Sequence, residues 1–309
     1  LDEQPPLPHD KDALDISLTV SGMLGAHPVP LLQTMRKTVV DGSNTSGFQR
    51  TTLVATDGVL ETDGGPVGID VLCLEEDSAR KLDSELTTSG EVVTWNLDRL
   101  GIPLIEIATA PDIKTPDHAK QTSIALGRTL RDTRRVRRGL GSIRQDLNVS
   151  IMCGDRVEIK GCQDLEWIPR IIRCEMARQL HFYRLANQLR EMHGLPSLPN
   201  DRREESESIE DQVNKILPLK LVDVTSRFTS CNANRVKHGL SEKSVMLALP
   251  LPGFSGLIGT KEFDADGAQM PRLGRELAGA AKLAGVAGVY HSDELPAYGI
   301  EQEFVDSTR

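Results

Sequence analysis

Two acidic segments of this chain have the residue types and the setting of a cation site. The segment VLCLEEDSAR places Glu75, Glu76 and Asp77 directly after an apolar run, and IPLIEIATAPDI places Glu106 inside another apolar run. A buried, ionised carboxylate is costly unless a cation or hydrogen bonds compensate its charge. Magnesium sites use one or two carboxylates, with water and substrate phosphates as further ligands. Glu76 and Glu106 are therefore a candidate magnesium pair, although spacing alone favours simple exposure of Glu106 at a strand edge.

A predicted β-hairpin supplies a second polar surface. In QDLNVSIMCGDRVEIKGC, apolar and polar residues alternate along both strands, which predicts one buried and one polar face. A three-residue loop, residues 153–155, pairs Val149 with Ile159 and keeps the apolar side chains together. Alternation alone favours a solvated face, and a polar ligand is the alternative. The polar face and its approach carry five candidate binding residues: Arg144, Asp146, Asn148, Glu158 and Lys160.

An arginine-rich segment precedes this hairpin. RRVRRGLGSIR contains five arginines in eleven residues, and its two glycines allow the backbone to approach a ligand closely. Arginines contact phosphate groups well, but they also stabilise the C-terminal end of a helix through its dipole. A phosphate-contacting surface and a solvated helix end both remain open interpretations here. The arginines are Arg134, Arg135, Arg137, Arg138 and Arg144.

The composition indicates a globular protein without a disulfide framework. The chain has 309 residues, a formal net charge of −9 and 4% aromatic residues, which argues against a general RNA-coating surface. Its five cysteines include no C-x-x-C pair, so we expect a reducing, cytoplasmic environment. We see no apolar run long enough to span a membrane and no signal peptide, so no membrane partner is expected.

Periodicity and turn residues predict an α+β fold. Short β-branched runs separated by turn signals predict a strand-rich region over about residues 36–166, including the hairpin of residues 146–160 in a mixed β-sheet core. Thr115 and Pro116 mark the N-cap and first residue of a helix. Apolar residues at helical spacing predict a second helix over residues 167–193. A polar linker over 194–215 and a separate α+β unit should follow.

Several long segments resemble the E subunits of archaeal glutamyl-tRNA(Gln) amidotransferases, with the bacterial B subunits as more distant relatives. The resemblance is collinear over about residues 30–180. It rests on five segments: MRKTVVDGSNTSGFQRTTLVATDG, LCLEEDSAR, LDRLGIPLIEIATAPDI, VRRGLGSIRQDLNVSI and RVEIKGCQDLEWIPRIIRCE.

The last third of the chain carries a second resemblance. From about residue 216 to 300 it is similar to the insert domain that these archaeal proteins share with bacterial-type aspartyl-tRNA synthetases, and this insert distinguishes the E type from the B type. The resemblance implies three parts: a cradle-like amidotransferase domain over residues 1–215, the insert over 216–301, and a truncated tail over 302–309.

The family resemblance implies a two-step reaction on glutamate attached to tRNA. ATP, together with Mg²⁺, phosphorylates the side-chain carboxylate of Glu-tRNA(Gln), and ammonia then displaces phosphate to give Gln-tRNA(Gln). The ammonia comes from an asparaginase-like partner subunit of the GatD type. A cytoplasmic hetero-oligomer is therefore expected.

Carried over residue by residue, the resemblance implies roles for ten side chains. Glu76 and Glu106 match the catalytic magnesium ligands. The residues that would line the same cradle around ATP or the substrate are Arg144, Asp146, Asn148, Glu158 and Lys160. The residues that fall in a motif near the ammonia route or the tRNA acceptor end are Arg36, Lys37 and Arg50.

Two features of the family have no counterpart in the sequence. The family begins with a strand of the Gly-Leu-Glu-x-His type, and it continues beyond the insert into helical and tail domains. We therefore expect a fragment of an E-type protein. The alternative functions are a non-catalytic tRNA- or subunit-binding fragment and a bacterial B-type protein.

Overall fold

The computed structural model describes residues 7–87, 90–204, 211–213, 220–261, 263, 270–293 and 298–308. It consists of two units, one of residues 1–147 and 159–172 and the other of residues 148–158 and 173–309. The boundary expected at residues 215–216 lies outside the described residues. The division falls earlier, at Arg173, because the helix beyond this point contacts the 148–158 hairpin through Gln179.

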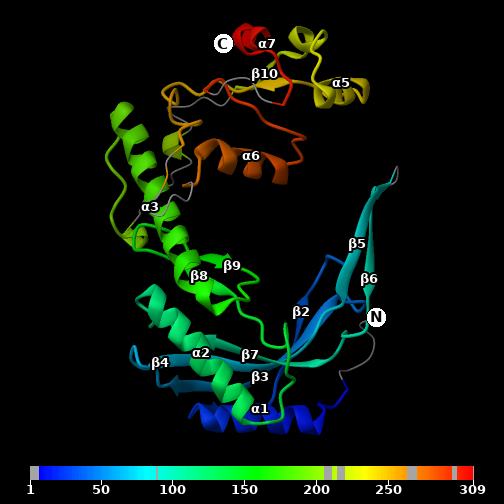
Figure 1. The fold of residues 1–309 in the computed structure, drawn as a ribbon, viewed down its shortest axis with the longest axis vertical. Coiled ribbons are helices and arrows are strands. Elements are labelled where there is room, and N and C mark those ends of the chain that lie inside the picture. The colour runs from blue at the N-terminus through cyan, green and yellow to red at the C-terminus, as the bar shows by residue number, and fades with distance from the viewer. Residues whose placement is uncertain are drawn as a thin grey trace. The chain divides into compact units, whose positions relative to one another are not determined.

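The first unit is built on a five-stranded sheet (Figure 1) in which β1, β3, β4 and β7 are neighbours in that order and β2 also pairs with β3. All four pairings are antiparallel, so the expected mixed sheet is wrong. Short connections such as the one between β3 and β4 permit only antiparallel pairing, because parallel neighbours need a long crossover. The strands are β1 His27–Pro28, β2 Thr34–Thr38, β3 Phe48–Leu60, β4 Val67–Glu76 and β7 Pro103–Thr109.

Two helices, α1 Lys11–Met23 and α2 Pro116–Asp132, pack against one face of this sheet (Figure 1). Thr115 caps α2 by accepting the N–H of His118 at 3.2 Å, and Pro116 follows it, which confirms the predicted helix start. The core between helices and sheet includes Val20, Leu24, Leu72, Leu74, Ile105, Ile107 and Leu126. No helix among the described residues is long and apolar enough to cross a membrane.

Two hairpins form two-stranded sheets of their own. Strands β5 Arg80–Thr87 and β6 Gly90–Asn96 form one, and β8 Leu147–Val149 and β9 Val157–Ile159 form the other. The prediction that the hairpin of residues 146–160 belongs to the core sheet is therefore wrong. Its predicted alternation is confirmed, because Leu147 and Val149 are buried while Asn148 and Glu158 are exposed. Alternation identifies the buried face of a strand but not the partner that buries it.

The second unit combines helices with a short antiparallel ribbon. Its described elements include most of α3 Ile168–Met192, α5 Asn234–Ser241, α6 Leu273–Leu283, α7 Gln302–Thr308, and the ribbon β10 Val222–Asp223 and β11 Leu247–Ala248. Phe228 is fully buried and stacks on Phe304 of α7, with ring centroids 5.5 Å apart. The expected tail over residues 302–309 is thus wrong for its described part, because α7 contributes buried side chains to the core of this unit.

Candidate functional site

The strand register decides which glutamates can meet. Between β4 and β7, Glu106 lies opposite Cys73, and Glu76 lies opposite Pro103. Directly opposed residues share a face and successive residues alternate, so Glu75 lies on the face of Cys73 and Glu106. Glu76 points to the other face. The expected Glu76–Glu106 pair is therefore wrong, and Glu75 is the glutamate beside Glu106.

Glu75 and Glu106 lie on a surface that we call the carboxylate face, opposite the face that α1 and α2 cover. Thr51 donates its hydroxyl to Glu75 Oε1 at 2.8 Å, and Lys37 Nζ lies 3.7 Å from the same oxygen. Gln49 bonds the backbone carbonyl of Glu76 at 2.8 Å, which fixes the end of β4. The face comprises Lys37, Gln49, Thr51, Cys73, Glu75 and Glu106.

Glu75 and the surroundings of Glu106 change the pKa of Glu106. Partial loss of hydration raises the pKa of Glu106, and the charge of Glu75 and a hydrogen bond between the two groups raise it further. Lys37 opposes this rise, whereas Asp146 adds to it. Burial and the same two glutamates raise the pKa of the Cys73 thiol to about 11, so the thiol stays protonated at neutral pH. These surroundings therefore favour the protonated form of Glu106.

Glu76 has a different partner on the helix-covered face. It forms an ion pair with Arg50, whose guanidinium also donates to the carbonyl of Leu7 at 2.7 Å. These side chains line a small cavity of about 70 Å³ together with His9 and Asp10. Glu76 thus anchors the residues that precede α1.

The residues predicted for an ammonia route or acceptor end divide between the two faces. Lys37 is on the carboxylate face, whereas Arg36 lies opposite Arg50 on the other. The Arg36 guanidinium stacks over the ring of Phe48 at 5.1 Å. The structure therefore does not bring these three cations together.

Arg144 is anchored beside the carboxylate face. Its Nη2 atom lies 3.1 Å from Oδ1 of Asp77, a buried residue directly after β4. Arg99 Nε lies 3.7 Å from the other oxygen of this carboxylate. Asp77 also bonds the loop of residues 97–102 through its backbone, since its N–H donates to Ile102 at 2.8 Å. This buried aspartate fixes where the arginine-rich segment meets the sheet.

The remaining candidates of the hairpin fall into two groups. Asp146 accepts the N–H of Gly161 at 3.2 Å, lies 3.4 Å from Lys160 Nζ, and is close enough to Glu106 to raise its pKa. Asn148 and Glu158 belong to the second unit. Their participation in one site with the carboxylate face stays a prediction.

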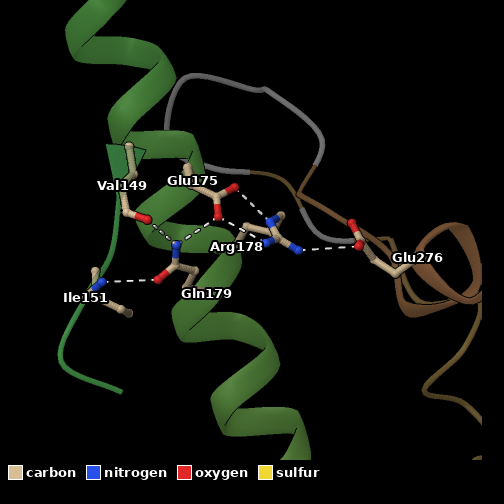
Figure 2. Close-up of polar contacts among 6 residues, drawn as sticks. All are labelled: Val149, Ile151, Glu175, Arg178, Gln179 and Glu276. Carbon is tan, nitrogen blue, oxygen red and sulfur yellow. Dashed lines mark hydrogen bonds and ion pairs between the residues drawn. The ribbon is translucent and has the colours of Figure 1, made fainter. Parts of the chain in front are cut away.

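Gln179 is a structural residue that the sequence pattern did not reveal. Figure 2 shows its side-chain amide bonded to two backbone groups of the hairpin, the carbonyl of Val149 at 3.1 Å and the N–H of Ile151 at 3.1 Å. The amide also donates to Glu175, which accepts two further bonds from Arg178. One available signal was its position three residues after Met176, on the apolar side of the helix.

Known proteins share this sequence over almost its whole length. The family model of the GatB/GatE catalytic domain matches residues 3–267. The E subunit of the glutamyl-tRNA(Gln) amidotransferase of Methanocaldococcus jannaschii is 46% identical over 99% of this chain and 44% of its own length. The corresponding proteins of Pyrococcus furiosus and Methanosarcina acetivorans are 45% and 44% identical over 100% of this chain, and 45% and 44% of their own lengths. The chain thus spans less than half the length of these relatives.

The match extends through both units, from the sheet with the carboxylate face to the hairpin and α3. Identity at this level over the full chain leaves no question of common descent. The chain belongs to the GatB/GatE family.

Proposed function

We propose that this chain carries the kinase and amidotransferase site of an enzyme that converts Glu-tRNA(Gln) to Gln-tRNA(Gln). The observation that carries the proposal is the strand register, which places Glu75 and Glu106 on the same face, near enough for Glu75 to raise the pKa of Glu106. The names of the relatives support it, because these proteins are called glutamyl-tRNA(Gln) amidotransferase subunits.

The proposed chemistry has two balanced steps. An oxygen of the substrate's side-chain carboxylate attacks the γ-phosphorus of ATP, so that an acyl phosphate forms and ADP leaves. Ammonia then attacks the acyl carbon, phosphate leaves with the bonding electrons, and the surplus proton passes to solvent. Activation is required because phosphate is a far better leaving group than an oxide ion. The protein contributes mainly by positioning and electrostatics.

Glu75 and Glu106 fit a magnesium site as two of its oxygen ligands. Two carboxylates in contact lose their mutual repulsion when a divalent cation lies between them. Among the described residues no three His, Cys, Asp or Glu side chains gather into a complete metal site, so water and nucleotide phosphates fit the other ligand positions. When bound, Mg²⁺ supplies neutralisation of the phosphate charges. Glu75 replaces Glu76 in the expected ligand set, and Glu75 and Glu106 would hold the ion.

Other side chains of the first unit surround this pair. Lys37 adds a positive charge next to Glu75, where it can meet a phosphate oxygen. Arg144, which Asp77 holds, and the paired Asp146 and Lys160 are proposed to contact ATP or the glutamyl group. Asn148 and Glu158 remain proposed ligand-binding residues of the hairpin.

The proposed enzyme needs a source of ammonia. We propose an asparaginase-like partner subunit of the GatD type, and therefore a hetero-oligomer. Residues 216–301 are proposed to form an insert domain related to that of bacterial-type aspartyl-tRNA synthetases, since they include the helices and short ribbon of a small α+β unit.

Exchange of single glutamates tests the proposal in the whole gene product with its partner. Glu106→Gln keeps the shape of the side chain but removes its charge. We expect phosphoryl transfer from ATP, measured as ADP formed in the presence of Glu-tRNA(Gln), to fall by a factor of about 100 or more. Glu75→Gln should act in the same way.

Glu76→Gln is the matched control, because it makes the same chemical change one residue away on the other face. We expect it to retain most of the activity. If Glu76→Gln abolishes phosphoryl transfer while Glu75→Gln does not, the proposed ligand pair is wrong. A wild-type protein that binds tRNA but forms no ADP supports the non-catalytic alternative instead.

A further inference from the structure

The arginine-rich segment contains two kinds of side chain. Arg135 pairs with Asp12 and Asp15 of α1, and Arg144 is held by Asp77. These two guanidinium groups already have structural partners. The other three arginines of the segment are exposed and form no ion pair within the part of the chain that the structure describes: Arg134, Arg137 and Arg138.

Two more arginines extend this set onto the end of α2. Arg128 and Arg131 are exposed and likewise have no ion-pair partner in the described ranges. Between residues 128 and 138 the sequence has one carboxylate, Asp132. We call the five side chains the arginine surface: Arg128, Arg131, Arg134, Arg137 and Arg138.

The helix dipole does not account for this surface. A cation stabilises a helix C-terminus only within the last turn, and Arg131 already occupies that turn. Arg137 and Arg138 follow the end of α2 at Asp132 by more than one turn. The chain has 45 acidic residues against 36 basic ones, yet none of these five arginines forms an ion pair in the described structure. Like charges without partners repel each other, so the arrangement fits an external anion.

We propose that the arginine surface binds phosphate groups along the backbone of an RNA strand, and that this RNA is the tRNA substrate. The inference rests on the proposed function for the identity of the RNA. Arginine forms planar, bidentate hydrogen bonds with phosphate, and five exposed arginines spread over eleven residues suit a chain of phosphates better than one compact triphosphate.

Leu140 adds an apolar contact at the end of this surface. It lies between Gly139 and Gly141, which both adopt positive φ angles, and its side chain is fully exposed. Apolar side chains, leucine among them, can insert against the bases of a bound nucleic acid. We therefore expect Leu140 to contact a nucleoside of the same RNA.

Salt-dependent binding separates these contacts from general attraction. The affinity of the whole gene product for an unacylated tRNA(Gln) transcript is measured by fluorescence anisotropy across a series of salt concentrations. Arg137→Ala combined with Arg138→Ala should weaken binding on the order of tenfold at low salt and reduce the slope of log K against log salt by about 1.5. Leu140→Ser should weaken binding without a change of slope.

Arg135→Ala is the matched control, because it removes the same charge from the same segment but from a side chain already paired with acidic residues. We expect it to leave the slope unchanged. Equal loss of slope in Arg135→Ala would show that only net charge matters and would overturn the proposal. Unchanged tRNA binding together with lost association with a purified partner subunit would overturn it in favour of a protein interface. Weaker ATP binding of the double arginine variant with intact tRNA binding would also overturn the proposal and would identify the nucleotide as the ligand.

The proposed function fails independently of this surface. ADP formation that persists in Glu106→Gln would contradict the catalytic proposal while the tRNA slopes still decide the role of the arginines. Conversely, loss of activity in Glu106→Gln with unchanged slopes in the double arginine variant would contradict only the RNA surface.

Discussion

At the scale of single residues, two adjacent glutamates of β4 have separate roles. Glu75 contributes to the carboxylate face, whereas Glu76 holds Arg50 on the face that the helices cover. The two side chains are chemically identical, so only the strand register assigns them. Substitution of Glu75 is therefore expected to affect activity, whereas substitution of Glu76 is expected to affect mainly the Arg50 ion pair.

The raised pKa of Glu106 predicts a specific dependence of stability on pH. In the unfolded chain its pKa is ordinary, about 4.3. Because the folded protein holds the proton more tightly, the stabilisation from Glu106 is complete below the unfolded pKa and is lost as pH rises through the raised folded pKa. The Glu106→Gln variant has no carboxyl group to ionise at this position, so it does not lose this stability as pH rises. Without magnesium we expect its melting temperature to exceed that of the wild type above this range, with no gain at pH 4 and below.

Calorimetric melting curves over a pH series in EDTA measure this difference. Addition of Mg²⁺ should stabilise the wild type but not Glu106→Gln, because binding of an ion adds free energy only to the form that binds it. Glu76→Gln is the comparison, and it should lower stability by up to about 1 kcal/mol through loss of the Arg50 ion pair. Equal melting temperatures of wild type and Glu106→Gln at every pH would contradict the strained pair.

The sequence pattern located the acidic segments, but it did not identify which glutamate of the first segment lies on the face of Glu106. An apolar run followed by Glu75 and Glu76 predicts a strand that ends in acidic residues, and β4 confirms this. The choice between neighbours depends on which residue of β7 lies opposite, here Cys73 facing Glu106. That information resides in long-range pairing and not in the local pattern.

At the scale of elements, Gln179 links the hairpin to α3. Its side-chain amide bonds the backbone of Val149 and Ile151 as a neighbouring strand would (Figure 2), and the Gln179 side chain is buried. A Cβ atom at Gly154 would come within 2.1 Å of its Oε1 atom, so the hairpin loop needs glycine at this position. Gln179 cannot move aside without loss of both backbone bonds.

Gln179→Leu should therefore loosen the hairpin. The substitution leaves a buried carbonyl and a buried N–H without partners, which costs about 1–3 kcal/mol for each group. We expect faster hydrogen exchange at the amide of Ile151, measured by NMR or mass spectrometry. Gln188→Leu on the exposed side of α3 is the control and should leave this exchange rate unchanged. Equal protection of Ile151 in both variants would show that the amide of Gln179 is dispensable.

The elements that depend on local signals were predicted well. Thr115 and Pro116 define the start of α2, and apolar spacing defines α3 over nearly its predicted range. Strand β5 was missed, because Lys81, Asp83 and Glu85 alternate with few apolar residues and its hairpin is largely exposed. Its pairing with β6 stabilises a strand for which the local sequence pattern gives little signal.

At the scale of the whole chain, α7 belongs to the core of the second unit. Phe304 is 5% exposed and stacks on Phe228, although the sequence suggested a tail at this point. Phe304→Ala should lower the free energy of unfolding of this unit by about 3–5 kcal/mol. Urea denaturation followed by hydrogen exchange in α5 measures the effect. Phe263→Ala at an exposed position makes the same chemical change and should cost under about 1 kcal/mol.

Composition and local patterns alone do not reach the function of this chain. The net charge of −9 conceals the arginine surface, since charge counts ignore which cations are already paired. Long collinear segments predicted the family, and the match over residues 3–267 confirms it. Which arginines remain available is a property of the folded chain, because Asp12 and Asp15 neutralise Arg135 only after α1 packs beside α2.

The Glu75–Glu76 dipeptide has a consequence for comparison of related sequences. An alignment can place a single glutamate of a relative opposite either Glu75 or Glu76, yet this choice exchanges a carboxylate-face residue for one that anchors the N-terminal segment. To transfer a site assignment between relatives at this dipeptide, the paired strands β4 and β7 of the two proteins must be superposed. The sequence alone does not specify on which face of the sheet a glutamate side chain lies.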